Sequence, residues 1–405
     1  MDLLTEYRKN PIPKELSFPE AEYTERLKKV RKLMAEEDMD VLLITSTPNK
    51  CYLTGYQTVM SHSYSCVIVP REGQLAMHLP EAETACALLT SVIDDLIVFD
   101  WYKFKDPGSQ LAEVLRERGF ADKRIGIEMS SEDVWESGAM DVRTYLRLKE
   151  LLPQAQLQDA TNLVLKIRMI KSPAELDYMR KAGELSFKGA KAAIAAAGVG
   201  KTDNDMEAAA YYTMIGGGSE ILSIDPMILT GHRSGWMPHN MYKRVPLKVG
   251  DPLYIEITGT YERYNAPNMR SAVIGDATDT VRRLSDASLH IVNLLLENIK
   301  PGRTGHEVAM EARKGFAPVE SIAYFHGAFG YSIGLGFPQT WTEAPMYIAD
   351  GIDRPLEPGM TFHLPICIWV PGQCGIGFSE SVAVTETGCE VLTPGNDREL
   401  VVIPA

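Results

Sequence analysis

The chain has 405 residues, of which 45% are hydrophobic, and its formal net charge is −13. This length and composition suffice for two domains, each with its own hydrophobic core. The negative charge argues against a nucleic-acid partner, because binding phosphates requires clustered Lys and Arg. The first residues, MDLLTEYRKN, do not form a signal-peptide pattern, and no apolar run is long enough to cross a membrane. We therefore expect a cytoplasmic protein without a membrane partner.

The cysteines show neither a CxxC pair nor a regular spacing. In a chain of this length, we expect buried free thiols instead of a disulfide framework or a zinc site. The six cysteines are Cys51, Cys66, Cys86, Cys367, Cys374 and Cys389.

The first part of the chain alternates helix and strand patterns. Residues 19–37 predict a helix, because their apolar side chains recur at helical spacing. The apolar run VLLIT at 41–45 is typical of a buried strand. Runs at 65–70 and 74–80 flank turn residues and predict a hairpin, and IGIEM at 125–129 predicts another strand. This alternation predicts an α/β domain.

The second part combines longer helices with long strands. SPAE at 172–175 is a capping box with proline at the first helical position, so a helix is expected to begin there. Further helices are predicted at 202–215, 280–300 and 304–316, and strands at 252–257, 360–370 and 380–385. This pattern predicts an α+β domain in which the helices cover a curved sheet.

The predicted organisation is therefore an α/β domain over residues 1–161 followed by an α+β domain over residues 162–405. The linker is expected near residues 157–165.

Four segments of the second domain resemble a known family. They are VGDPLYIEITGTYERYNAPNMRSAVIG at 249–275, GYSIGLGFP at 330–338, PGMTFHLPICIWV at 358–370 and GFSESVAVTETG at 377–388. Together they resemble the pita-bread hydrolases, the family of methionine aminopeptidase, prolidase and creatinase. The resemblance extends over essentially the whole chain. It implies a pita-bread catalytic domain preceded by a smaller creatinase-type α/β domain.

The resemblance also shows what the chain lacks. In the metal-dependent members, two Asp, one His and two Glu from these segments hold two metal ions. The corresponding residues here are Glu256, Pro267, Tyr331, Pro365 and Glu380. Two carboxylates cannot hold a metal pair, and proline offers no side-chain donor. We therefore expect neither a metal nor another cofactor.

The resemblance then points to the metal-free branch, which includes creatinase and ectoine hydrolase. Creatinase keeps the later His and Glu where this chain has Tyr331 and Pro365, so the departures are more similar to ectoine hydrolase. The implied reaction opens the cyclic amidine ring of ectoine to N-acetyl-diaminobutyrate, in osmolyte catabolism. The alternative is a creatinase-type amidinohydrolase acting on creatine or a related guanidino or amidine compound. A prolidase-type metallopeptidase and a non-catalytic binding module are disfavoured, the first by the lost ligands and the second by the retained His239 and Glu256.

Two inward carboxylates without a metal predict the charge of the substrate. Glu256 stands in an apolar strand, with Ile255 and Ile257 on the opposite face, and Glu380 begins another apolar strand. Like charges close together raise the pKa of one carboxyl, so the pair is expected to share a proton. A small zwitterionic or cationic substrate would let both ionise and would present two donors to them.

Three residues are predicted to carry the chemistry: Glu256, His239 and Glu380. The resemblance places His239 where creatinase has its acid/base histidine, and imidazole suits proton transfer near neutrality. Glu256 is expected to act either as a general base on water or as a nucleophile that forms an ester. The sequence leaves this choice open.

A second group of residues is predicted to contact the substrate. His326 resembles a pocket histidine of the family, and His232 or Arg270 could meet a substrate carboxylate. Tyr331 could donate a hydrogen bond or a ring face, or it could be an ordinary core residue. Tyr56 belongs to a GY motif at 55–56, and in creatinase-like dimers the loop after this motif reaches into the site of the partner subunit, so the resemblance implies a homodimer. His363 is expected to be a strand residue without a role. The predicted substrate-binding residues are Tyr331, Trp236, His232, His326, Pro267, Pro365 and Tyr56.

Overall fold

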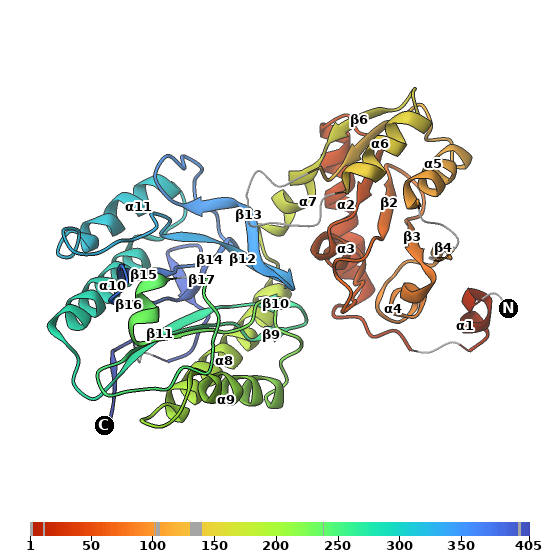
Figure 1. Ribbon diagram of the computed structural model, residues 1–405. Helices are drawn as coiled ribbons and strands as arrows, with labels where there is room; N and C mark the ends of the chain where they lie inside the picture. The colour runs from red at the N-terminus through yellow and green to blue at the C-terminus, as the bar shows by residue number, and fades with distance from the viewer. Residues whose placement is uncertain are drawn as a thin grey trace. The chain divides into compact units, whose positions relative to one another are not determined.

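The computed structural model of the protein describes residues 3–10, 13–100, 102, 106–129, 140–237, 239–395 and 398–405. The chain forms two compact units, Met1–Arg168 and Met169–Ala405 (Figure 1). Pro238, which precedes the predicted acid/base histidine, lies outside the described residues. None of the described helices is both long and apolar enough to span a membrane.

Unit 1 is an α/β domain, as predicted. Its helices are α1 (Leu3–Lys9), α2 (Glu20–Glu36), α3 (Thr47–Thr54), η1 (Glu81–Glu83), α4 (Thr84–Thr90), α5 (Pro107–Glu117), α6 (Val142–Leu151) and α7 (Thr161–Arg168). Its strands are β1 (Val41–Ile44), β2 (Cys66–Pro70), β3 (Ala76–Pro80), β4 (Asp95–Phe99), β5 (Arg124–Ile127) and β6 (Gln156–Asp159). They hydrogen-bond in the order β4-β3-β2-β1-β5-β6.

The sheet of unit 1 follows the sequence patterns closely. Strand β2 pairs antiparallel with β3, which confirms the predicted hairpin. The apolar run predicted at 41–45 forms the central strand β1, which pairs antiparallel with β2 and parallel with β5. Its residues are fully buried, as expected of a strand covered on both faces.

The boundary between the units lies C-terminal to the predicted one at residue 161. Residues 157–165, the predicted linker, form the end of β6 and most of α7. Helix α7 belongs to unit 1 because it packs against α2 and α3, and Arg168 at its end donates a 2.7 Å hydrogen bond to Asn49.

Unit 2 contains the longer elements. Its helices are α8 (Pro173–Ala196), α9 (Asp203–Gly216), η2 (Gly231–Trp236), α10 (Asp279–Asn298), α11 (Gly305–Arg313) and η3 (Lys314–Phe316). Its strands are β7 (Met227–Thr230), β8 (Pro252–Ile257), β9 (Thr260–Tyr261), β10 (Tyr264–Asn265), β11 (Asn268–Ile274), β12 (Gly330–Phe337), β13 (Thr340–Ile348), β14 (Thr361–His363), β15 (Ile366–Val370), β16 (Cys374–Phe378), β17 (Ser381–Val384), β18 (Cys389–Val391) and β19 (Val401–Ile403).

Helix α8 begins where the capping box predicts. The Ser172 side chain accepts from the Glu175 N–H, and the Glu175 carboxylate accepts from the Ser172 N–H at 2.8 Å. In Figure 1, α8 lies beside α9, and α10 lies beside α11. Helix α8 packs on β8 and β11, whereas α10 packs on β15 and β16.

The strands of unit 2 hydrogen-bond in separate ladders instead of the one curved sheet expected. One has the order β18-β17-β14-β12-β10-β9, with β13 on β12; another has the order β19-β11-β8-β7; and β15 pairs with β16. The run at 360–370, predicted as one strand, is divided between β14 and β15 at Leu364 and Pro365. Proline has no N–H to donate to a ladder, so the strand ends there and the chain enters another ladder.

Candidate active site

The candidate site is built around Glu256 on strand β8. This strand pairs with β11 on one side and β7 on the other, so it is not an edge strand. Ile255 and Ile257 belong to the hydrophobic core on one face, and alternation places Tyr254 and Glu256 on the other. The structure thus confirms the expected orientation of Glu256, which is almost fully buried.

The immediate contacts of Glu256 are polar but uncharged. The hydroxyl of Tyr254 donates to Oε2 at 2.5 Å, and Nδ1 of His363 lies 3.9 Å from Oε1. Burial raises the pKa of Glu256 to about 7, although the hydrogen bond from Tyr254 lowers it in part. At neutral pH this carboxyl therefore exists in both protonated and ionised forms.

Sulfur atoms line the side of Tyr254. Its hydroxyl lies 3.4 Å from Sγ of Cys367 and 3.7 Å from Sδ of Met269. Burial, followed by the charge of Glu256, raises the pKa of the Cys367 thiol. All six cysteines are free thiols, but only four are buried as predicted, because Cys86 and Cys389 are half-buried. These weakly polar groups do not solvate a carboxylate well, so they help to keep the pKa of Glu256 high.

His363 is a strand residue at the end of β14, as expected, and it stands in the middle of a hydrogen-bond chain. Nδ1 lies 2.8 Å from the hydroxyl of Tyr331, which accepts from Nε1 of Trp341 at 2.9 Å. Nε2 lies 2.7 Å from Oγ of Ser379, which accepts from the Met269 N–H at 2.6 Å. Burial lowers the pKa of His363 to about 3, so its imidazole is neutral.

The same chain gives Tyr331 a defined place. Burial, and then the charge of Glu256, raises the pKa of Tyr331, and both residues lie near Nδ1 of His363, at 2.8 Å for the tyrosine hydroxyl and 3.9 Å for Oε1 of Glu256. Tyr331 nevertheless retains some exposed surface. When Nδ1 of His363 carries the proton and donates to Tyr331, the tyrosine hydroxyl is free to donate to a ligand.

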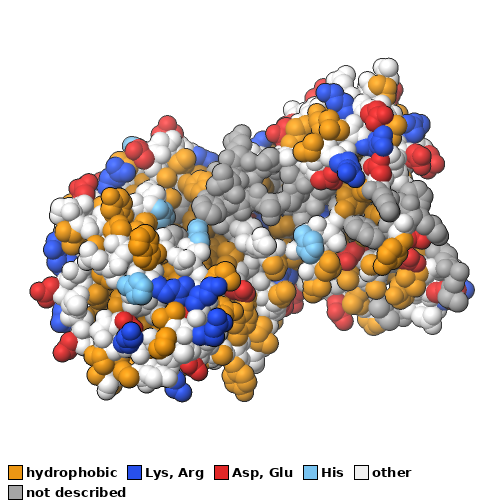
Figure 2. All heavy atoms as spheres, in the orientation of Figure 1, with side chains coloured by type: hydrophobic (Ala, Val, Ile, Leu, Met, Phe, Trp, Pro, Cys, Tyr) orange, Lys and Arg blue, Asp and Glu red, His pale blue; other side chains and the backbone are white. Residues whose placement is uncertain are grey.

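Two further histidines approach from the surface. His239 and His326 both have exposed side chains, and Figure 2 shows histidine side chains reaching the surface of unit 2. Desolvation by neighbouring protein atoms lowers the pKa of both histidines. For His326, a hydrogen bond to the backbone of Pro365 partly raises the pKa, and the charge of His239 lowers it. His326 in turn lowers the pKa of His363. Tyr331 and Glu256 are thus the predicted residues that the structure places next to His363.

Glu380 differs from Glu256 because it has a counter-ion. Oε1 lies 3.0 Å from Nη2 of Arg270 and 3.4 Å from Nη1 of Arg398. Thr393 donates to Oε2. Glu380 and Arg270 are both buried, so this is an internal ion pair.

This pairing corrects the expectation that the two glutamates share a proton. The pKa of Glu256 is raised by burial and lowered by Tyr254, and Glu380 does not contribute. Arg270 also donates to the carbonyls of Met269 and Ser379, at 2.8 and 2.9 Å. Arg270 is therefore engaged inside the fold rather than held out to a substrate carboxylate.

The remaining predicted residues of unit 2 lie in different settings. Trp236, at the end of η2, is 61% exposed, and His232 is also exposed. Pro267 is buried next to β11, and its carbonyl accepts from Oγ of Ser381 at 2.7 Å. Pro267 thus holds neighbouring segments together through its backbone.

Tyr56 has an internal partner in unit 1. It is buried, and its hydroxyl donates to Oε2 of Glu83 at 2.6 Å. This contact supports a role within unit 1 and leaves no surface for a substrate.

The sequence missed the residues that surround Glu256. Tyr254 could have been found, because it stands two positions before Glu256 and so shares its strand face. His363 and Ser379 gave no local signal, since their contacts come from segments far apart in the chain.

The donor set does not fit a metal pair. No three or more His, Cys, Asp or Glu side chains of the described residues gather in a way that could hold a metal ion. Glu380 already pairs with Arg270, whose charge would repel a cation, and the carbonyl of Pro267 is used by Ser381. Glu256 is the one carboxylate of the five family positions that remains without a counter-ion.

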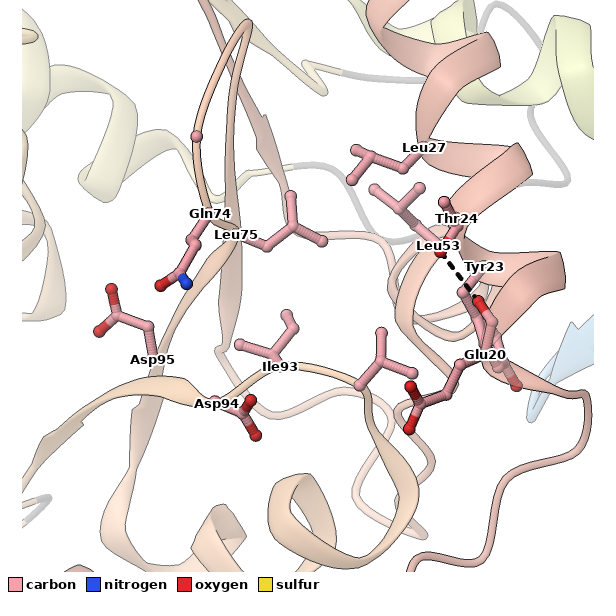
Figure 3. Close-up of a pocket in the computed structure, with 12 residues that line it drawn as sticks. Glu20, Tyr23, Thr24, Leu27, Leu53, Gln74, Leu75, Ile93, Asp94 and Asp95 are labelled. Atoms are coloured by element: carbon pink, nitrogen blue, oxygen red, sulfur yellow. Dashed lines mark hydrogen bonds between the residues drawn. The ribbon is translucent and has the colours of Figure 1, made fainter.

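A separate cleft of about 270 Å³ lies in unit 1 (Figure 3). Leu27, Leu53, Leu75 and Ile93 form its apolar walls, with Glu20 and Asp94 near its edges. None of its lining residues is a predicted site residue, and it contains no histidine, cysteine or lysine. It therefore does not compete with the Glu256 cluster as a catalytic site.

The chain matches known families along most of its length. Residues 177–386 match the family described as Metallopeptidase family M24. Residues 26–170 match the Creatinase/Prolidase N-terminal domain.

Several characterised or solved proteins are similar to the whole chain. An ectoine hydrolase of Halomonas elongata is 31% identical over 395 residues, covering 93% of this chain and 96% of that protein. An Xaa-Pro dipeptidase of Pyrococcus furiosus is 26% identical over 377 residues, covering 93% and 99%. The crystal structure of dipeptidase PepE from Mycobacterium ulcerans has a TM-score of 0.80 at 26% identity, covering 96% of this chain and 100% of that one.

Glu256→Gln is expected to stabilise the fold at alkaline pH. The pKa of Glu256 in the folded protein, about 7, lies above its ordinary value of 4.5. The folded state therefore binds this proton more tightly than the unfolded state does. The stability that comes from this binding is fully present below pH 4.5 and is lost as the pH rises through 7. Above pH 8 the buried charge costs about 3 kcal/mol, which Gln avoids. Urea unfolding at pH 5 and pH 8.5 should show the advantage of the variant growing with pH. The exposed Glu297→Gln is the control, and equal pH dependence in all three proteins would contradict the expectation.

Glu380→Gln is expected to lower the free energy of unfolding by about 3 kcal/mol, because it leaves the buried Arg270 without its main counter-ion. The double variant with Arg270→Met should recover part of the loss, since that charge is then removed as well. Urea unfolding of the single and double variants measures both changes. Wild-type stability in Glu380→Gln would show that the ion pair does not support the fold.

Proposed function

We propose that this chain, which belongs to the Metallopeptidase family M24 and carries a Creatinase/Prolidase N-terminal domain, is a hydrolase that works without a metal. In this proposal it opens the amidine ring of ectoine to N-acetyl-diaminobutyrate. The whole-length similarity to an ectoine hydrolase supports this choice of substrate. The proposal includes a homodimeric protein with a small zwitterionic or cationic substrate.

One observation carries the proposal: Glu256 is a buried carboxyl without a counter-ion. Its pKa of about 7 means that it releases its proton readily when a positive charge arrives. A protonated amidine is planar, carries a delocalised positive charge and offers N–H donors that fit a carboxylate. Such a ligand supplies the charge that Glu256 lacks, whereas a neutral peptide bond does not.

The reaction consists of attack on the amidine carbon and cleavage of a ring C–N bond. In one route, Glu256 removes a proton from water, and the hydroxyl adds to the carbon. In the other, the carboxylate adds to the carbon, and water then cleaves the resulting ester. In both routes the ring C–N bond breaks as the leaving nitrogen takes up a proton from His239, and the attacking water supplies the oxygen of the new acetyl carbonyl and, through Glu256 and His239, the protons that this nitrogen gains. The product carries the acetyl group on one nitrogen and a free amine on the other.

The neighbouring residues orient the reacting groups. Tyr254 holds the Glu256 carboxyl through its 2.5 Å hydrogen bond. Neutral His363 fixes the Tyr331 hydroxyl, which lies within electrostatic reach of Glu256. A fixed hydroxyl beside the carboxylate can hold the substrate in one orientation, which is worth several kcal/mol of the barrier in favourable cases.

Similarity to Xaa-Pro dipeptidases makes peptide hydrolysis the second candidate. The donor set argues against it, since three of the five family positions hold Pro267, Tyr331 and Pro365. A creatinase-type reaction on a guanidino compound needs the same cation recognition, and so it remains the alternative within the proposed class.

Chelator-treated protein is expected to convert ectoine to N-acetyl-diaminobutyrate, followed by NMR beside metal analysis of the same sample. Glu256→Gln and His239→Ala should each lower turnover by about 10²–10⁴-fold, while Glu297→Gln keeps wild-type turnover. Cleavage of creatine alone would select the alternative substrate. Activity that needs added metal and an Xaa-Pro dipeptide would overturn the proposal.

The rate is expected to rise with pH, because the ionised form of Glu256 reacts. In kcat/KM, which reports the free enzyme, the acidic limb should lie near pH 7, the pKa of Glu256. In kcat, which reports the complex, this limb should move to lower pH because the bound cation favours the carboxylate. Initial rates between pH 5 and 9 test both limbs. Limbs at the same pH would mean that the substrate brings no positive charge to Glu256.

A further inference from the structure

The segment that carries His239 is tied to the start of helix α9. This segment connects η2 to β8. Within it, the N–H groups of Lys243 and Val245 donate to the two carboxylate oxygens of Asp203, each at 2.7 Å. The N–H of Asp203 donates to the carbonyl of Val245 at 3.2 Å. Asp203 thus holds the stretch after His239 through three main-chain hydrogen bonds.

The same carboxylate also reaches the stretch before His239. Nη1 of Arg233, in η2, lies 3.2 Å from Oδ2 of Asp203, and Nη2 donates to the carbonyl of Met241. Asp203 and Arg233 therefore connect both sides of His239 to one point. The next residue, Asn204, adds a 2.7 Å hydrogen bond from the N–H of Arg244.

The donors around Asp203 require a carboxylate at this position. It is fully buried, and it accepts from the N–H of Asn204 at 2.9 Å as well as from Lys243, Val245 and Arg233. An amide of the same shape would turn an NH₂ group towards main-chain donors, and so it would lose contacts that the carboxylate makes. Only a negative charge at this place also balances the guanidinium of Arg233.

From these contacts we propose that Asp203 is a positioning residue, which holds the segment of His239 and so fixes the position of the imidazole. The inference rests on the proposed function, in which His239 is the acid/base. His239 lies at the surface, whereas Asp203 is buried and holds the main chain after His239 and, through Arg233, the stretch before it. Proton transfer is sensitive to small displacements, so loosening this connection lowers the rate without touching the reacting atoms.

A double-mutant cycle on the full-length protein tests this role. Asp203→Asn should lower kcat about 10- to 100-fold and leave KM within about twofold, because the substrate still meets Glu256. The same substitution in the His239→Ala background should cost less than about twofold, since the residue held in place is already gone. An equal loss in both backgrounds would overturn the proposal, because Asp203 would then serve the fold in general.

The matched control is Asp205→Asn in the same helical turn. The Asp205 carboxylate accepts from the Thr202 N–H at 2.8 Å and caps α9, but it does not contact the segment of His239. It should leave kcat within about twofold of the wild type. A loss like that of Asp203→Asn would attribute the effect to the helix cap and overturn the proposal.

An NMR titration tests the connection without any substrate. The imidazole signals of His239, assigned by their loss in His239→Ala, should titrate below the ordinary pKa of 6.5 in the wild type. In Asp203→Asn the pKa should move towards 6.5, because the ring leaves its neighbours. Arg233→Gln, which breaks the same connection from the other side, should give the same shift and stands in if Asp203→Asn does not fold. An unchanged titration in a folded variant would overturn the inference, and this result is independent of whether ectoine is the substrate.

Discussion

The cost of burying a carboxyl without a counter-ion is the constraint on which the site depends. Glu256 must either keep a proton or receive a positive charge from outside, because neutral groups such as Tyr254 and His363 surround it. Strand β8 enforces this choice by fixing Glu256 between two neighbouring strands. In the proposed reaction, the recognition of a cation and the activation of the carboxylate would be one event, so that the site would be selective with few charged groups of its own.

The two glutamates retained at the family positions have taken opposite roles. Glu380 is neutralised within the fold by Arg270, and the pair joins β11 to the start of β17. Glu256 has no such counter-ion, and burial raises its pKa. In the proposed function, the substrate would supply to Glu256 transiently the positive charge that Arg270 supplies to Glu380 permanently. Because Arg270 neutralises Glu380, Glu256 is the one of these two carboxyls that has no counter-ion.

Sequence patterns predicted the features that depend on neighbours in the chain. The capping box at Ser172, the hairpin of β2 and β3 and the inward face of Glu256 follow from spacings of two to four residues. Contacts across the chain were not predictable in this way. Arg270 and Glu380 are 110 positions apart, and a local pattern does not indicate which buried arginine meets which glutamate. The division of the run at 360–370 was missed because apolar composition does not show to which ladder a strand belongs.

The two prolines limit what a single substitution could add to the site. Pro365 stands where the chain passes from β14 to β15, and the carbonyl of Pro267 is held by Ser381. Replacing either proline by an acid would return one donor to a backbone shaped for its absence, and Arg270 would still occupy Glu380. A single substitution of this kind would therefore not create a metal pair in this chain, because the ion pair between Arg270 and Glu380 would remain.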